Sequence, residues 1–237
     1  MDDHGNIEPT ERRLTRRGTL LKAGGLLGAV VGASAWRALD DEDASASGLA
    51  AVESGAVSCV LAPELTEGPY YVPDERMRRD ITEGKAGMPL TLRLRVLDVS
   101  TCKPIKGAAV DIWHCDALGV YSGVQGNAAN FLRGVQRTDA SGVASFRTVY
   151  PGWYHGRAVH VHVKVFVGGN VVHTGQFFFP AAVTNAVARR RPYSRHGRPD
   201  TPNASDSIFR NGGSRSMLKL TRSGKGYVGA ISMGVRR

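Results

Sequence analysis

The sequence predicts an all-β protein, built as an antiparallel β-sandwich with long loops and only a few short helices. From residue 90 onward, segments of alternating or β-branched residues are separated by short turns, which is typical of sandwiches. No stretch after residue 36 repeats its apolar residues with a helical period over a long range, and this argues against a helical bundle. Residues 61–237 suffice for a single domain with a sizeable core.

Several segments of this region are expected to be strands. Residues 90–98 alternate apolar and polar side chains, as a half-buried strand does. The pair Gly168-Gly169 predicts a tight hairpin between two of the later strands. In chain order, the expected strands cover residues 90–98, 108–113, 142–148, 158–167, 171–179 and 224–235.

The N-terminus predicts export. The run TRRGTLLK at residues 15–22 resembles a twin-arginine signal, and the apolar stretch that follows ends in Ala-Ser-Ala, as a cleavage site does. That apolar stretch is too short to span a bilayer stably. We therefore expect residues 1–35 to be a twin-arginine signal peptide, although an uncleaved anchor or an amphipathic helix is an alternative.

The expected destination is the periplasm, the extracellular space or the cell envelope, with no stable membrane insertion once the signal is removed. Residues 36–60 are acidic, small and without periodicity, which predicts a flexible leader. The folded domain is then expected to cover residues 61–237.

The positive charge of the chain does not indicate a nucleic-acid partner. The formal net charge is +10 at pH 7, but much of it is local. Arginines crowd into residues 189–198 beside a proline and a glycine, a pattern typical of a surface loop. No nucleic-acid-binding motif accompanies them.

Three cysteines, Cys59, Cys102 and Cys115, are present in a chain expected to enter an oxidising compartment. One disulfide and one free thiol are the simple expectation. The sequence leaves all three pairings open. A zinc site is disfavoured because no two of these cysteines have C-x-x-C spacing.

The segment RAVHVH at residues 157–162 is the most distinctive in chemical terms. Because side chains alternate along a strand, His160 and His162 project from the same face of the strand expected there. Two imidazoles so placed can hold a metal, but an exposed strand face without metal is also compatible with an isolated pair. The tyrosines upstream, Tyr121 and Tyr154, add further candidate ligands.

Together, five ordered motifs resemble those of the intradiol ring-cleavage dioxygenases of the protocatechuate and catechol type, with the twin-arginine signal pointing to an exported branch. These are non-haem ferric enzymes that open catechols between their two hydroxyl groups. The resemblance covers about residues 61–235 and implies a prealbumin-like sandwich core. Its motifs are TEGPYY at 66–71, VDIWHCDALGVY at 110–121, PGWY at 151–154, RAVHVH at 157–162 and TGQ at 174–176.

Carried over residue by residue, the resemblance implies that Tyr121, Tyr154, His160 and His162 bind one Fe(III) per chain. Phenolate oxygens and imidazole nitrogens suit this hard ion, which holds phenols deprotonated below their usual pKa of about 10. The implied partners are a catecholic substrate and O2, and the implied product is of the cis,cis-muconic acid type.

The resemblance also implies roles for residues around the metal. Tyr154 leaves the metal when catechol binds, Arg157 stabilises the charge that develops on the ring, and Gln176 is the polar partner of Arg157. Tyr70 and Tyr71 are expected to line the substrate pocket together with Arg157 and Gln176. The structural alternatives are a salt bridge for Arg157, an ordinary strand amide for Gln176 and simple packing for the two tyrosines.

Five further residues have weaker predictions. Trp113 is expected in the core, and His114 and Asp116 beside it are possible supports for the metal ligands. His173 and His196 have no partner at metal-ligand spacing and are expected at the surface.

Two other functions compete with the dioxygenase hypothesis. One is a prealbumin-like, non-catalytic binding or adhesion module of the cell envelope. The other is a zinc or copper enzyme that uses His160 and His162, which is disfavoured because phenolate is an uncommon zinc ligand. A homo-oligomer is compatible with the sequence. The sequence does not identify which catechol is the substrate.

Overall fold

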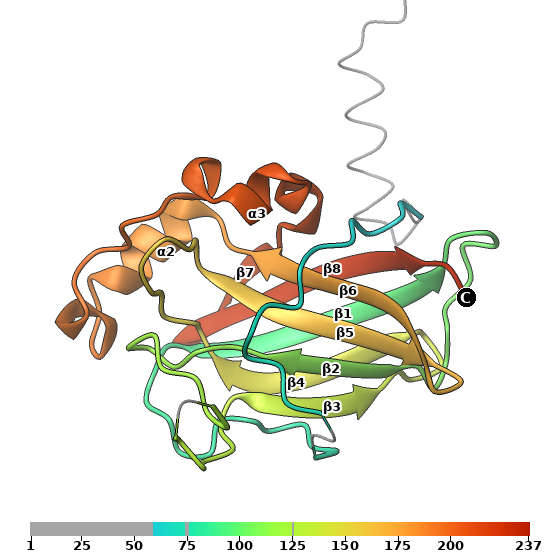
Figure 1. Ribbon diagram of the computed structural model, residues 1–237, viewed down its shortest axis with the longest axis horizontal. Coiled ribbons are helices and arrows are strands. Elements are labelled where there is room, and N and C mark those ends of the chain that lie inside the picture. Colours follow the sequence, from blue (N-terminus) through green and yellow to red (C-terminus); the bar gives the residue numbers. More distant parts are fainter. Residues whose placement is uncertain (1–58, 74–75, 125) are drawn as a thin grey trace, which may run out of the picture. The chain divides into compact units, whose positions relative to one another are not determined.

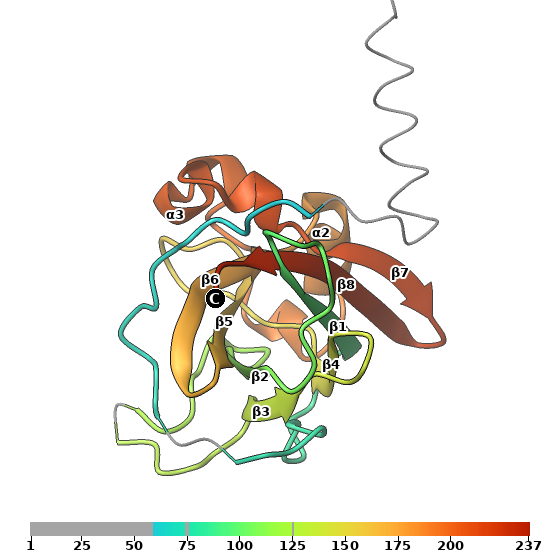
Figure 2. The same cartoon turned by 90° about the vertical axis from the view of Figure 1, so that its right-hand side faces the viewer.

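The protein, seen in a computed structural model, is described for residues 59–237 apart from residues 74, 75 and 125. Two four-stranded sheets pack face to face in this region and form the predicted sandwich (Figure 1, Figure 2). The expected signal peptide, residues 1–35, lies outside the described residues, as does nearly all of the expected leader, residues 36–60. Among the described residues, no helix has the length and apolar character needed to cross a membrane.

The first sheet has the strand order β4-β1-β8-β7, and the second sheet has the order β3-β2-β5-β6. The strands of the first sheet are β1 Pro89–Asp98, β4 Val143–Val149, β7 Lys219–Ser223 and β8 Gly226–Val235. Those of the second sheet are β2 Ala109–Trp113, β3 Arg133–Arg137, β5 His160–Val167 and β6 Asn170–Phe178. The expected strands are confirmed with small differences at their ends.

Two strands were not predicted. β3 has the sequence RGVQR and β7 has the sequence KLTRS, so neither shows the alternation of apolar residues that indicates a strand. Both lie at the edge of a sheet, where charged side chains are common because one side of the strand faces solvent.

One prediction about strand direction is wrong for the first sheet. β1 and β8 pair in parallel, with Leu94 opposite Ile231, whereas the other strand pairs are antiparallel. β8 follows the second sheet and the helical segments in the chain, and its hairpin joins it to β7. No hairpin joins β8 to β1, so nothing local predicts the direction of that pairing.

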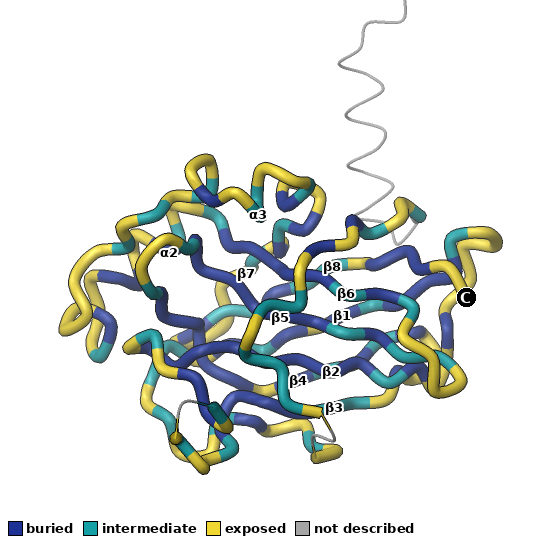
Figure 3. The backbone as a smooth tube through the Cα atoms, in the orientation of Figure 1, coloured by how far each residue is buried: buried dark blue, intermediate teal, exposed yellow. Residues whose placement is uncertain are grey.

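The hydrophobic core lies between the two sheets (Figure 3). Alternate residues of each strand point inward, so that Leu92 and Leu94 of β1 meet the layer formed by Val161, Val163 and Val165 of β5. All five side chains are completely buried. The remaining residues of β5 must therefore project from the outer face of the second sheet.

That outer face is covered by residues 61–73, which we call the strap. In Figure 1 the strap crosses in front of the second sheet. The Ala62 amide donates to the Gly234 carbonyl at 2.9 Å, and the Leu65 amide donates to the Thr174 carbonyl at 3.0 Å. These bonds hold the strap first to β8 and then to β6.

Short helices complete the fold, as predicted. They lie between β6 and β7 in the sequence and gather at one end of the sandwich (Figure 1). The arginines of residues 189–198 are exposed there, which confirms a surface loop. The helices are α2 Ala181–Ala188 and α3 Ser207–Arg210, with 3₁₀ turns at η1 Tyr193–Arg195, η2 Asn203–Ser205 and η3 Gly213–Ser216.

The cysteines differ from the expectation of one disulfide, because all three are free thiols. Cys115 is buried and belongs to a cluster with Trp113 and Tyr121. The Cys59 thiol donates to the Asp98 carbonyl at 3.5 Å, the same carbonyl that accepts from the Cys102 amide at 2.7 Å. Cys59 and Cys102 are therefore neighbours, while Cys115 lies apart in the interior.

Candidate metal centre

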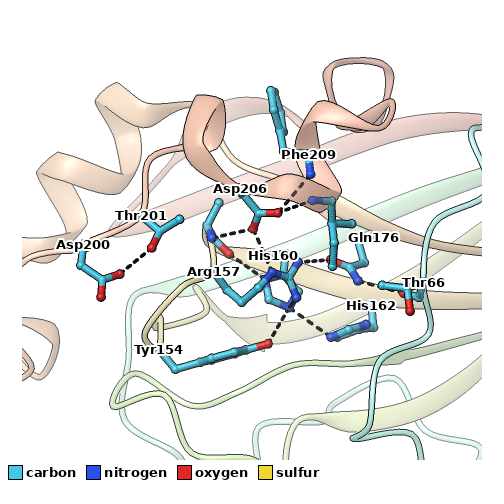
Figure 4. A network of polar contacts seen from close by, with 12 residues as sticks. Thr66, Tyr154, Arg157, His160, His162, Gln176, Asp200, Thr201, Asp206 and Phe209 are labelled. Atoms are coloured by element: carbon cyan, nitrogen blue, oxygen red, sulfur yellow. Dashed lines mark hydrogen bonds and ion pairs between the residues drawn. The ribbon is translucent and has the colours of Figure 1, made fainter.

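Two phenols and two imidazoles converge on the outer face of the second sheet. The His160 Nε2 atom lies 3.1 Å from His162 Nε2, 3.2 Å from the Tyr154 hydroxyl and 3.4 Å from the Tyr121 hydroxyl. Figure 4 shows Tyr154 and His162 directed toward His160. The structure thus brings together all four residues predicted as metal ligands.

The strand geometry of β5 explains the two histidines. Alternation places His160 and His162 on the face opposite Val161 and Val163. His160 is 3% exposed and His162 is 1% exposed, because the strap and neighbouring loops cover this face. The predicted shared face is confirmed, and the alternative of an exposed strand face is wrong.

The orientation of His160 is set by a hydrogen bond at its other nitrogen. His160 Nδ1 lies 2.6 Å from the Ala158 carbonyl oxygen, which can only accept, so Nδ1 carries the proton. The lone pair of Nε2 then points toward the other three candidate metal ligands, which we call the donors together with His160. A carbonyl behind the ring is the usual arrangement for a metal-binding histidine.

His162 is held by packing. Its ring stacks on Trp113 with the centroids 4.9 Å apart and the planes 7° apart. The strap closes over its edge at Gly68, where an added Cβ would lie 3.1 Å from His162 Cε1. Gly68 also has a φ of +73°, which favours glycine. Among the described residues, no group hydrogen-bonds His162 Nδ1.

The two tyrosines come from loops that pack tightly against each other. Tyr121 follows the turn around Gly119, and Tyr154 follows Trp153 in the segment between β4 and β5. A Cβ on Gly119 would lie 2.3 Å from the Trp153 carbonyl oxygen, so only glycine allows this approach. Asp116 supports the same turn by accepting from the amides of residues 118 and 120 at 2.9 and 3.1 Å.

Burial keeps all four groups uncharged in the protein without metal. Desolvation, assisted by the positive charge of Arg157, lowers the pKa of His160 to about 3, and the pKa of His162 is also well below its ordinary value. Desolvation raises the pKa of Tyr121 and of Tyr154 above that of a free phenol. The imidazoles are thus ready to bind a cation, and the phenols need one in order to ionise.

The donor set fits a single metal ion. Metal bonds to nitrogen and oxygen are about 2 Å long, so adjacent donors around one ion lie roughly 3 Å apart, close to the 3.1–3.4 Å separations around His160 Nε2. A set of two phenols and two imidazoles favours a hard, strongly acidic cation.

Arg157 and Gln176 stand beside the donors. The Arg157 Nη2 group donates to Gln176 Oε1 at 2.5 Å, and the Gln176 amide nitrogen donates to the Thr66 carbonyl at 2.8 Å. Arg157 Nη1 lies 3.5 Å from His160 Nε2. The register of the second sheet pairs His162 with Gln176, which explains why a residue of β6 reaches this site.

The two strap tyrosines take different positions. Tyr70 stacks on Tyr121, with ring centroids 4.4 Å apart, and meets Tyr154 edge-on at 6.1 Å. Tyr71 packs against Trp113 at 4.9 Å and lies beneath the Lys164 ammonium. Of the predicted pair, Tyr70 contacts the donors directly, whereas Tyr71 reaches His162 through Trp113.

Two of the weaker predictions need correction. His114 does not support a metal ligand, because its ring nitrogens contact the Cys115 carbonyl at 2.8 Å and the Thr148 hydroxyl at 2.7 Å. His173, expected at the surface, is buried next to Glu64 on the strap. His196 is exposed, as predicted, and lies 2.6 Å from the Trp153 carbonyl. Trp113 is buried, as predicted.

Asp206, at the start of α3, was missed by sequence reasoning although it contacts Arg157 directly. Its sequence signal is that of a helix N-cap, since an aspartate precedes the short run Ser-Ile-Phe-Arg. That signal predicts a helix start and does not reveal the arginine, because Arg157 is far away in the chain.

Comparisons with known proteins agree with this geometry. A family model described as Dioxygenase matches residues 66–184. A solved intradiol ring-cleavage dioxygenase from Tetranychus urticae is 33% identical, has a TM-score of 0.72, and is matched over 75% of this chain and 95% of that chain. The dioxygenase domain of a fusion protein from Streptomyces sp. SirexAA-E is 30% identical, with a TM-score of 0.58 and coverages of 75% and 99%.

Curated relatives are matched over a shorter part of their length. Catechol 1,2-dioxygenase 2 of Acinetobacter lwoffii is 35% identical over 139 residues, which is 55% of this chain and 46% of the relative. Chlorocatechol 1,2-dioxygenase of Pseudomonas putida is 29% identical over 139 residues, 51% of this chain and 52% of the relative. The chain thus spans about half the length of these two relatives. The matched family model and the solved structures show that the chain belongs to the intradiol ring-cleavage dioxygenase family.

Proposed function

We propose that the protein is a non-haem Fe(III) dioxygenase that inserts O2 between the two hydroxyl-bearing carbons of a catechol. The product would be of the cis,cis-muconic acid type. One observation carries the proposal: two phenol oxygens and the His162 Nε2 atom lie within 3.4 Å of His160 Nε2, with a guanidinium beside them. The matched relatives named catechol and chlorocatechol dioxygenases support the same substrate class.

Fe(III), one ion per chain, would be held by Tyr121, Tyr154, His160 and His162. When bound, the ferric ion lowers the pKa of the phenols and makes a chelated catechol reactive toward O2. Two phenolates and a hydroxide balance its charge, so the buried site stays neutral.

The two phenols differ in their suitability as proton acceptors. Tyr121 is 6% exposed and is covered by Tyr70, whereas Tyr154 is only half-buried. A catechol brings two protons into the site, and one of them can be taken up at the Tyr154 hydroxyl oxygen. Burial raises the pKa of Tyr154, which favours the protonated phenol once it is free.

Arg157 and Gln176 would act on the substrate. The guanidinium points toward the donors from the side and is fixed by Gln176, so it can stabilise negative charge that develops on the catechol ring. Tyr70, stacked on Tyr121, offers a flat aromatic wall for an aromatic substrate.

The competing functions are less well supported. A non-catalytic binding module would not need four converging metal-type donors in a buried site. A zinc enzyme is disfavoured because two of the four candidate ligands are phenols, and phenolate is an uncommon ligand of zinc.

Two measurements on the purified mature protein test the proposal. We expect a broad visible tyrosinate-to-iron absorption band that shifts when catechol is added without oxygen, and oxygen uptake with catechol, protocatechuate or hydroxyquinol. Tyr154→Phe and His160→Ala variants should lose this oxygen uptake. A wild-type protein that stays colourless after Fe(III) reconstitution would refute the proposal and favour the binding module.

We also propose that the protein is exported through the twin-arginine pathway, on the basis of the run TRRGTLLK and the apolar stretch that follows. The double variant Arg16→Lys, Arg17→Lys should remain in the cytoplasmic fraction, while the unaltered chain appears outside it. Equal fractionation of both proteins would contradict this proposal without affecting the enzymatic one.

A further inference from the structure

Asp206 is a completely buried carboxylate that does more than begin a helix. Its Oδ1 atom caps α3, accepting from the amides of Ile208 at 2.7 Å and Phe209 at 3.1 Å. Its Oδ2 atom faces the other way and accepts from Arg157 Nε at 2.9 Å and from the Ala158 amide at 2.8 Å. An N-cap needs only the first pair of bonds, so the second pair requires another explanation.

The second pair of bonds determines how Arg157 is presented. The guanidinium is planar and has donors on three edges. Asp206 accepts from its Nε edge and Gln176 from Nη2, which leaves Nη1 directed toward His160 Nε2 at 3.5 Å (Figure 4). Without Asp206, the guanidinium would keep among the described residues its bond to Gln176 and its 3.5 Å contact with His160 Nε2. Both contacts are made by the Nη atoms, so nothing would fix the Nε edge against rotation of the long side chain.

Asp206 also contacts the backbone on which His160 depends. The Ala158 amide donates to Asp206 Oδ2, and the Ala158 carbonyl accepts from His160 Nδ1. The same carboxylate oxygen therefore connects the arginine beside the donors and the main chain that orients one of them. The charge of the pair is balanced, since a buried carboxylate lies against a mostly buried guanidinium.

We propose that Asp206 is a positioning residue for catalysis: it holds Arg157 in the direction in which the guanidinium stabilises charge on the bound catechol. This inference rests on the proposed dioxygenase function. Asp206 does not contact the four proposed metal ligands. Its removal should therefore reduce turnover much more than it reduces metal content or substrate affinity.

Two substitutions separate positioning from capping. Serine is a good N-cap but is too short to reach Arg157 while capping, so Asp206→Ser should preserve α3 and lose the arginine contact. In Asp206→Asn, one end of the amide is a donor, which cannot accept from the Arg157 and Ala158 N–H groups while the oxygen caps the helix. Asp139→Asn is the matched control, because Asp139 caps a surface turn at residues 141 and 143.

In the iron-loaded enzyme, we expect both Asp206 variants to lower kcat roughly 10- to 100-fold, as a displaced catalytic group does. KM for catechol, iron content and the visible band should stay close to the wild-type values. In an Arg157→Ala background, the Asp206 substitutions should have little further effect on kcat, because Asp206 acts through the arginine. Asp139→Asn should leave all of these quantities unchanged.

A readout in the metal-free protein does not depend on activity. The Arg157 Nε–H signal in NMR spectra, assigned by its loss in Arg157→Lys, should exchange slowly with solvent in the wild type and in Asp139→Asn. It should exchange at least about tenfold faster in both Asp206 variants, because the buried acceptor is gone.

Three results would overturn the inference: unchanged kcat in both Asp206 variants, an effect on kcat that is fully additive with Arg157→Ala, or unchanged exchange of the Arg157 Nε–H. Loss of iron and of the visible band in proportion to kcat would also overturn it, since Asp206 would then be structural. A colourless, inactive wild-type enzyme concerns the proposed function instead and is distinguished by the wild-type control.

Discussion

The two sheets of the sandwich share one core but differ on their outer faces. In the first sheet, the outer face of β1 carries the partly or fully solvent-accessible residues Arg93 and Arg95. In the second sheet, the outer face of β5 carries His160 and His162, which are almost completely buried, and β6 adds the buried Gln176. The strap accounts for much of this difference, since it crosses the second sheet (Figure 1).

This comparison teaches how the fold makes a reactive site without disturbing its core. The inward residues of both sheets pack as in any sandwich. The polar groups sit on the other side of the second sheet, where loops and the strap remove water and shift their pKa values. Stability and chemistry are therefore carried by opposite faces of the same strands, and they can be changed separately.

The largest expected effect concerns the outer face of the second sheet. His160→Ala should lose iron binding and oxygen uptake entirely, because it removes the nitrogen around which the other donors gather. Arg93→Ala, on the outer face of the first sheet, is the matched control and should keep both. Elemental analysis and an oxygen electrode measure the two quantities. Retention of one iron per chain by His160→Ala would rule out the donor set proposed here.

A core substitution should have the opposite profile. Leu94→Ala removes a completely buried side chain of β1 and should lower the free energy of unfolding by about 2–5 kcal/mol. The visible band and kcat of the folded fraction should be nearly unchanged, because Leu94 points away from the donors. Urea unfolding of the two proteins gives the difference. A large change in the band would show that core and site are not separable.

Acid should destabilise the protein through buried histidines associated with the second sheet. Burial lowers the pKa of His114 to about 4 from its ordinary 6.5. As pH falls, His114 takes up its proton in the unfolded chain before it does so in the folded protein. The free energy of unfolding that depends on neutral His114 is therefore fully present above pH 6.5 and is lost as pH falls toward 4. It amounts to about 3 kcal/mol. Urea unfolding of the metal-free protein from pH 7 to 4 should show a smaller loss in His114→Gln than in the wild type.

The smallest effect on activity is expected at the cysteines. A mild disulfide oxidant should join Cys59 to Cys102, which lie next to each other, and leave Cys115 reduced, since burial raises its pKa to about 12. Peptide mass mapping identifies the pair. Oxygen uptake should change little, because this bond would lie outside the donor set. A bond that includes Cys115 would contradict the expectation.

Much of this arrangement could be predicted before any coordinates. The alternation at residues 158–167 predicted both the strand and the shared face of its histidines, because side-chain period is a local property of the backbone. The two tyrosines were identified through their motifs. β3 and β7 were not predicted, since edge strands with charged residues lack an apolar period.

Other features depend on contacts between distant residues. The parallel pairing of β1 with β8 and the burial of His173 under Glu64 have no local signal. The same is true of Asp206, whose local pattern indicates a helix cap, whereas its partner Arg157 lies in a different part of the chain. Such pairings are set by how the elements pack.

By itself, the sequence determined the sandwich and the face of β5 that carries the histidines, because both follow from local patterns of residue type and spacing. Its ordered motifs also implied the set of four donors, through their resemblance to a known family. The tertiary structure decided that these side chains are largely buried, that the reactive atoms of the other three lie within 3.4 Å of His160 Nε2, and which residues orient Arg157. These properties arise only when the strap, the two tyrosine loops and α3 close on one sheet and exclude water from it.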